Sequence, residues 1–286
     1  MHELRTDVFA VTGVDTSPRY LSYLPITAQA WAKNSRTELI CGLVGHEKNS
    51  ELFRLLEKFC KVIPIPQLVG IDPRVQAKIS RLWIAQSDEY RTKKVSIVDM
   101  DMVPLNDRRN VLLREMPEHK IVKWGYDHLA YRNLREIGKW PMDGTSGYGS
   151  SFHELVNPHN MSFQELVDSW SQLDGDSRAN PFNTPTKFSD ESLLRELVLR
   201  NGENIQAKHL ARSLIEGKYL SGRIDRSARL PRRANKVLKD EKYFEFHGPT
   251  PFPHGTMFGK SLLTSLGIDY AFYREYLAKI QYLERS

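Results

Sequence analysis

Two aspartates, Asp99 and Asp101, stand one residue apart where a short apolar run ends, in the stretch KKVSIVDMDMVPLN at residues 93–106. A carboxylate at the end of a buried strand is costly unless a cation pairs with it. Hard divalent cations such as Mn²⁺ and Mg²⁺ prefer oxygen ligands and are often shared between carboxylates and substrate phosphates. The pattern therefore predicts a Mn²⁺ or Mg²⁺ site that neutralises a diphosphate leaving group.

The segments before these aspartates alternate between strand and helix patterns. Apolar, β-branched runs indicate strands, whereas apolar residues repeating every three to four positions indicate helices. We expect strands at residues 7–13, 38–45, 61–66 and 93–98, and helices at 20–34, 49–60 and 72–90. Asn49 or Ser50 would cap the second helix and Asp72 the third, and the prolines of 61–66 suggest a strand at the sheet edge. This alternation predicts an α/β fold with a mostly parallel sheet and helices on both faces.

The expected sheet explains how the aspartates meet other loops. Ligands of parallel sheets bind at the carboxyl ends of the strands. Gly13, which closes the first strand, Gly45, which closes the second, and the two aspartates all fall at that edge. We therefore expect the carboxylates to lie beside the loop that follows the first strand.

The second half of the chain is less regular. We expect a strand at residues 119–127, a strand that runs into a proline-rich loop over 242–255, a long polar loop at 171–189, and helices at 189–202 and 270–283. No internal repeat and no stretch resembling a linker divides the chain, so a single domain is expected.

The stretch VSIVDMDMVPL resembles the DxD motif of glycosyltransferases with the GT-A fold, and the pattern over residues 7–125 is similar to the nucleotide-binding half of that fold. The resemblance implies a single Rossmann-like domain. Residues 1–125 would form the donor-binding half, and residues 126–286 the acceptor-binding half with the C-terminal helix. It also implies transfer of a sugar from a nucleotide-sugar donor, most often a UDP-sugar, to a glycan or lipid-linked acceptor.

The same resemblance implies a set of metal ligands. Asp101 would bind the cation directly, and Asp99 would contact the cation or the donor ribose. Many GT-A enzymes complete the site with a histidine near the C-terminus that follows a strand, and His247 in YFEFHGP has that position. His254, with Lys260 six residues later, is the alternative, although the Lys-Pro-Trp ending of some family members is absent here.

Donor-binding residues follow from the resemblance in the same way. The loop at Thr12, Gly13 and Asp15 would hold the base and the ribose. Lys78 and Arg81 match the basic residues that the family places on the helix before the DxD strand.

A general base is expected at the start of the helix at 189–202. Inverting GT-A enzymes use an acid at such a position to accept the proton of the acceptor hydroxyl. Asp190 and Glu191 are the candidates, and the sequence leaves open which of them acts. An alternative interpretation is structural, because acids in the first turn of a helix also stabilise its macrodipole.

The chain carries a net charge of +6, and residues 218–242 contain nine Lys or Arg against three acids, which equals the whole excess. A local basic segment suggests an anionic partner such as a diphosphate or a phospholipid head group, or else a solvated face. No nucleic-acid motif is visible, so no nucleic-acid partner is expected. We expect a cytoplasmic protein, and peripheral contact with the inner membrane face stays open.

Two other functions compete with sugar transfer. Haloacid-dehalogenase-like phosphatases also place DxD after an apolar strand, usually the first strand of the domain, with the first aspartate as nucleophile. Here three strand-helix units precede Asp99. A non-enzymatic basic protein that binds membranes or nucleic acid is the second alternative, supported by the basic segment and the aromatic terminal helix.

Overall fold

The computed structural model describes residues 5–90, 93–115, 121–122, 147–148, 161–172, 193, 223–225, 238–241 and 243–285. Its central sheet has six strands in the order β3-β2-β1-β4-β7-β6. These are β1 (Arg5–Val14), β2 (Thr37–Val44), β3 (Lys61–Ile65), β4 (Lys94–Ile97), β6 (Ile121–Val122) and β7 (Gly147–Tyr148). Strands β1 to β4 are parallel, and β7 runs antiparallel to both β4 and β6. The predicted mostly parallel sheet is confirmed.

One face of the sheet is covered by α4 (Pro73–Ala85). Gly13 and Gly42 are paired neighbours in β1 and β2, and both face this helix. A Cβ atom on Gly13 would lie 1.8 Å from the carbonyl oxygen of Ala77, and one on Gly42 would lie 2.7 Å from Oγ of Ser80. The two glycines therefore let α4 pack unusually close to the sheet.

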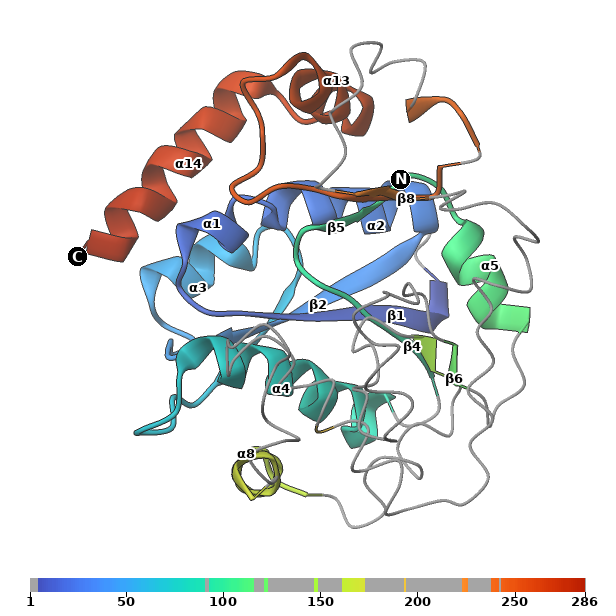
Figure 1. The fold of residues 1–286 in the computed structure, drawn as a ribbon. Helices are drawn as coiled ribbons and strands as arrows, with labels where there is room; N and C mark the ends of the chain where they lie inside the picture. The colour runs from blue at the N-terminus through green and yellow to red at the C-terminus, as the bar shows by residue number, and fades with distance from the viewer. Residues whose placement is uncertain are drawn as a thin grey trace, which may run out of the picture.

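Beyond α4 lies α8 (Phe163–Ser171), visible below it in Figure 1. Trp83 of α4 and Phe163 of α8 meet edge to face with ring centroids 6.0 Å apart. A capping box formed by Ser162 and Glu165 begins α8. These elements share a buried apolar cluster with β1, β2 and β4.

The opposite face carries most of the other helices (Figure 1). They are α1 (Pro18–Leu21), α2 (Leu24–Ser35), α3 (Glu51–Leu56), α13 (Met257–Leu266) and α14 (Tyr270–Arg285). Together they form the larger apolar cluster, with Trp31, Tyr23 and Tyr273 among its largest fully buried side chains. The first and last segments of the chain thus share one core.

A second, three-stranded sheet joins distant parts of the sequence. It contains β5 (Met102–Pro104), β9 (Glu245–His247) and β8 (Arg223–Asp225) in the order β5-β9-β8. Strands β5 and β9 are antiparallel, and Met102 is paired with His247. This pairing brings the C-terminal strand beside the segment that follows the two aspartates.

Several local predictions are confirmed. Ser50 and Asp72 cap α3 and α4 through their side chains, and the proline-containing β3 is an edge strand. The single helix expected at 20–34 is instead two helices, α1 and α2, with Pro25 at the start of the second. The remaining short elements are a 3-10 helix at Asp88–Tyr90 and α5 (Arg108–Glu115).

Helices α8 and α13 were not expected from the sequence. Of the helix predicted at 189–202, only residue 193 belongs to the described part of the chain. Across the described residues, no helix combines the length and the apolar character that a membrane crossing needs.

Candidate metal centre

The two aspartates lie on the turn that follows β4. The backbone N–H of Val98 donates to the carbonyl of Val11 at 2.9 Å, which extends the β1–β4 pairing by one residue before the turn. The side chain of Asp99 is 34% exposed, whereas Asp101 is buried. The strand has ended here, so strand alternation no longer fixes the direction of either side chain.

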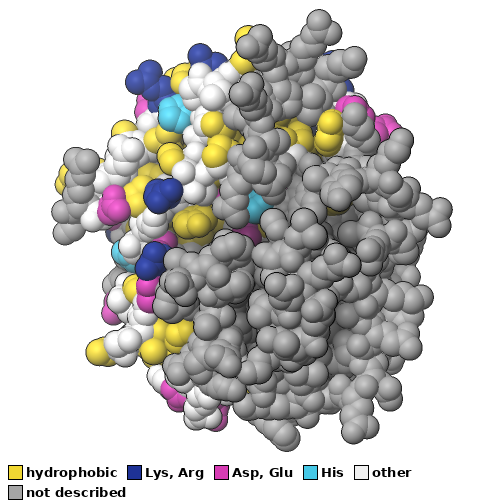
Figure 2. Space-filling view, in the orientation of Figure 1, with side chains coloured by type: hydrophobic (Ala, Val, Ile, Leu, Met, Phe, Trp, Pro, Cys, Tyr) yellow, Lys and Arg dark blue, Asp and Glu magenta, His cyan; other side chains and the backbone are white. Residues whose placement is uncertain are grey.

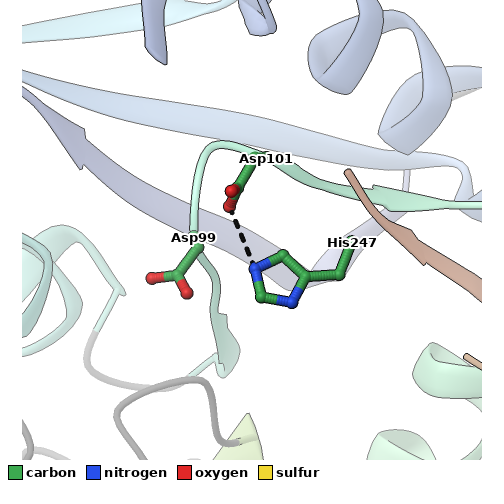
Figure 3. A group of neighbouring side chains, drawn as sticks. All are labelled: Asp99, Asp101 and His247. Atoms are coloured by element: carbon green, nitrogen blue, oxygen red, sulfur yellow. Dashed lines mark ion pairs between the residues drawn. The ribbon is translucent and has the colours of Figure 1, made fainter. Parts of the chain in front are cut away.

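His247 reaches this turn from the other end of the chain. The backbone N–H of Gly248 donates to the carbonyl of Asp101 at 3.1 Å, beside the Met102–His247 pair. Nε2 of the buried His247 lies 3.4 Å from Oδ1 of Asp101 (Figure 3). The structure thus brings together the three residues predicted as metal ligands.

One ligand atom from each of Asp99, Asp101 and His247 lies within 4.8 Å of the other two. Two carboxylate oxygens and one imidazole nitrogen suit Mn²⁺ or Mg²⁺, and a donor diphosphate could supply further oxygens. Figure 3 shows the aspartates on one turn and the imidazole facing them from a separate segment. The donor set therefore fits a divalent cation.

Basic side chains on α4 border the aspartates. Nη1 of the buried Arg81 donates to Oδ1 of Asp99 at 2.6 Å. Burial by itself would raise the pKa of Asp99, but neighbouring charge, above all that of Arg81, holds this pKa well below its usual range. His247 and Lys78 act in the same direction. Asp99 is therefore ionised at physiological pH and ready to bind a cation.

Of the three residues predicted to form a donor-binding loop, Thr12 and Gly13 lie within β1, and only Asp15 follows the strand. Thr12 is fully buried, and Gly13 packs against α4. Asp15 is half-buried, and its Oδ1 accepts a hydrogen bond from the backbone N–H of Ser17 at 3.0 Å. Burial raises the pKa of the Asp15 carboxyl above its ordinary value. Of the three, Asp15 has the side chain most accessible to a ligand.

The two histidine candidates have different surroundings. His247 joins the aspartates, whereas Nδ1 of His254 lies 3.3 Å from the carbonyl of Phe252, with its ring near Tyr270 and Tyr273. The geometry therefore favours His247 over His254 as the third ligand. The base candidates, Asp190 and Glu191, lie outside the described residues, so their predicted role stays a prediction.

Two residues that contact the backbone near the three ligands were missed by sequence reasoning. Thr27 donates through Oγ1 to the carbonyl of Met100 at 2.7 Å, and the hydroxyl of Tyr23 donates to the carbonyl of Pro249 at 2.6 Å. These contacts span 73 and 226 residues of sequence. No local pattern indicates a contact of that range.

The described part of the face in Figure 2 has mixed charge, with Lys and Arg side chains among hydrophobic and acidic ones. Most of the basic segment 218–242 lies outside the described residues. Its predicted anionic partner therefore stays a prediction.

No protein-family model matches the chain, and no curated protein matches it. The galactosyltransferase LgtC, crystallised with donor and acceptor sugar analogues, is 11% identical with a TM-score of 0.51, and the match covers 92% of this chain and 95% of that one. An active-site mutant of LgtC gives 13% identity at the same TM-score and coverage. The chain therefore has the GT-A fold of glycosyltransferases.

Proposed function

We propose that this protein is a metal-dependent glycosyltransferase that moves a sugar from a nucleotide-sugar donor to a glycan or lipid-linked acceptor. The observation that carries the proposal is the group of two carboxylates and one imidazole at the carboxyl end of β4. The fold shared with LgtC, which binds donor and acceptor sugar analogues, supports it. A UDP-sugar is the first donor to test.

Asp99, Asp101 and His247 would hold the cation in this proposal. When bound, Mn²⁺ or Mg²⁺ would offset the charge that develops on the diphosphate leaving group. Asp101 and His247 are buried, so they would hold the cation against the bottom of the site. The more exposed Asp99 lies on the side open to the donor.

The protein supplies charge of its own next to this group. Arg81 fixes the Asp99 carboxylate, and Lys78, one helical turn earlier on α4, adds a second positive charge. Both would attract the diphosphate and orient it toward the metal ligands. Asp15, with Thr12 and Gly13 behind it, would contact the base and ribose of the donor.

The acceptor side rests on the sequence. Asp190 or Glu191 would take the proton of the acceptor hydroxyl as it attacks the sugar. Residues 1–125 would contribute the donor half of the domain, and residues 126–286 the acceptor half. A cytoplasmic location at the inner membrane face is part of the same proposal.

A thermal-shift screen tests the donor directly. UDP-, GDP-, CMP- and dTDP-sugars would each be added with and without Mn²⁺. A ligand that binds only the folded state stabilises it by about 2.7 kcal/mol at 100 times its Kd. We expect one nucleotide class, UDP-sugars first, to raise the melting temperature in the presence of Mn²⁺ and much less in its absence.

Two histidine variants sharpen that screen. His247→Gln should abolish the Mn²⁺-dependent shift, whereas His254→Gln, outside the ligand group, should keep it. If no sugar nucleotide shifts the wild type, or if both variants respond like the wild type, the proposed function is wrong.

A further inference from the structure

Two side chains at the start of α2 are buried and donate hydrogen bonds to the backbone beside the metal centre. Tyr23 is the N-cap residue of α2, and Thr27 follows four positions later. Residues four apart lie on the same side of a helix. Both side chains are fully buried, so each hydroxyl needs a hydrogen-bond partner inside the protein.

Thr27 contacts the peptide between the two aspartates. Its Oγ1 donates to the carbonyl of Met100 at 2.7 Å in a buried position. Met100 is the single residue that separates Asp99 from Asp101. The hydroxyl therefore fixes the orientation of the peptide that joins Met100 to Asp101, in the middle of the aspartate turn.

Tyr23 contacts the segment that follows His247. Its hydroxyl donates to the carbonyl of Pro249 at 2.6 Å, and its ring meets Phe252 edge to face at 5.2 Å. A Cβ atom on Gly248 would lie 2.0 Å from the Tyr23 hydroxyl oxygen. The chain therefore passes directly over this hydroxyl one and two residues after the histidine.

We propose that Tyr23 and Thr27 are positioning residues that set the distance between the aspartate turn and His247, and that they thereby determine metal affinity. The inference rests on the proposed metal site. One rigid helix holds both backbone segments, so it fixes the separation of ligands that are nearly 150 positions apart in the sequence. Both residues act through hydrogen bonds to backbone carbonyls.

The expected size of the effect follows from other metal sites. Groups that orient metal ligands typically change metal affinity by about 10 to 100-fold when they are removed. Loss of either hydroxyl leaves a buried carbonyl without its donor and lets that segment move. We therefore expect Tyr23→Phe and Thr27→Val each to weaken Mn²⁺ binding by about tenfold.

The chain offers a closely matched control. The hydroxyl of Tyr276 donates to the carbonyl of Leu21 at 2.7 Å, so Tyr276→Phe removes the same type of bond from the same apolar cluster. Leu21 is not part of the aspartate turn or of the segment after His247. Thr27→Ser keeps the hydroxyl and should keep most of the affinity.

The experiment is a titration of the purified protein with Mn²⁺. Electron paramagnetic resonance measures the free Mn²⁺ at each step, and melting temperatures are measured on the same samples. We expect about tenfold weaker binding for Tyr23→Phe and Thr27→Val, with Tyr276→Phe and Thr27→Ser close to wild type. If the wild type binds Mn²⁺ but Tyr23→Phe and Tyr276→Phe have equal Mn²⁺ affinity, the positioning role is wrong and the metal site stands. A wild type that binds no Mn²⁺ would overturn the metal site and this inference together.

Discussion

On one face of the central sheet α4 directs charged side chains at the aspartate turn, whereas on the opposite face α2 hydrogen-bonds to the backbone near it. Arg81 of α4 donates to the carboxylate of Asp99, and Lys78 adds charge nearby. Thr27 and Tyr23 of α2 donate to backbone carbonyls instead. The α4 face sets the charge of the site, and the α2 face sets its shape.

This difference explains why the two faces are packed differently. A charged side chain must come within about 3 Å of a carboxylate to form a hydrogen bond, so α4 has to lie close to the sheet. Gly13 and Gly42 permit that approach. On the α2 face, large aromatic side chains pack together and hydroxyls donate to backbone carbonyls. These contacts fix the spacing between α2 and the backbone segments beneath it.

The largest effect is expected from forcing α4 away from the sheet. Gly13→Ala would place a Cβ atom 1.8 Å from a backbone oxygen of α4, a contact that no rotamer can relieve. Overpacking typically costs about 1–3 kcal/mol, and we expect the upper end of that range. Urea unfolding measures the loss of stability, and Mn²⁺ affinity should fall as Arg81 moves away from Asp99.

Gly255→Ala is the matched control for that change. No heavy atom lies within 4 Å of the Cβ position at Gly255, so the free energy of unfolding should change by less than about 0.5 kcal/mol. If the two alanine variants were equally stable, close packing of α4 would not be the function of Gly13.

The opposite face makes a prediction about alkaline pH. The hydroxyls of Tyr273 and Tyr276 in α14 donate to the carbonyls of Ser22 and Leu21, both at 2.7 Å. Burial raises the pKa of each tyrosine above its ordinary value of 10.0. The unfolded chain therefore loses these protons at lower pH than the folded protein. Their contribution to stability is complete below about pH 10 and is lost as pH rises further.

Tyr273→Phe tests this by removing one of the two titrating groups. The free energy of unfolding of the wild type should fall above pH 10 by up to about 1.4 kcal/mol per pH unit for each tyrosine. The variant should show a slope smaller by about that amount, measured by urea unfolding between pH 8 and pH 11. Identical slopes would mean that the hydroxyl of Tyr273 is not protected in the folded protein.

The smallest effects are expected at the outer helices of each face. Ser162 caps α8 on the α4 side, and Thr256 caps α13 on the α2 side, each by accepting a backbone N–H with its side-chain oxygen. Loss of such a cap costs about 1 kcal/mol. Ser162→Ala and Thr256→Ala should each lower the unfolding free energy by that amount, and Ser162→Asp should not. Mn²⁺ affinity should be unchanged in all three, because neither helix start contacts the metal ligands.

The first half of the fold could be predicted because its signals are local. Apolar strands, the Asp72 cap and the prolines of β3 are properties of a few adjacent residues, and the structure places them as expected. The position of Asp99 and Asp101 at a strand end follows from the same reasoning. The capping box at Ser162 is also local, and it could have indicated α8.

The rest of the site depends on contacts that no local pattern encodes. The pairing of His247 with the aspartate turn required knowledge of a family, because it joins segments nearly 150 residues apart. The closeness of Gly13 to Ala77 and the bond from Tyr23 to Pro249 depend on how whole helices are placed. Hydrophobic periodicity identifies a helix and its buried side, but it does not identify the carbonyl that a buried hydroxyl will meet.

The claim on which the account depends is that Asp99, Asp101 and His247 bind one divalent cation together. Crystals soaked with Mn²⁺ and a UDP-sugar test it most directly through the anomalous scattering of the metal. We predict a single strong peak within about 2.5 Å of ligand atoms from the two carboxylates and the imidazole, and its loss in Asp101→Asn crystals. A wild-type map with no peak at these three residues, or with the metal and the nucleotide bound elsewhere, would contradict the account.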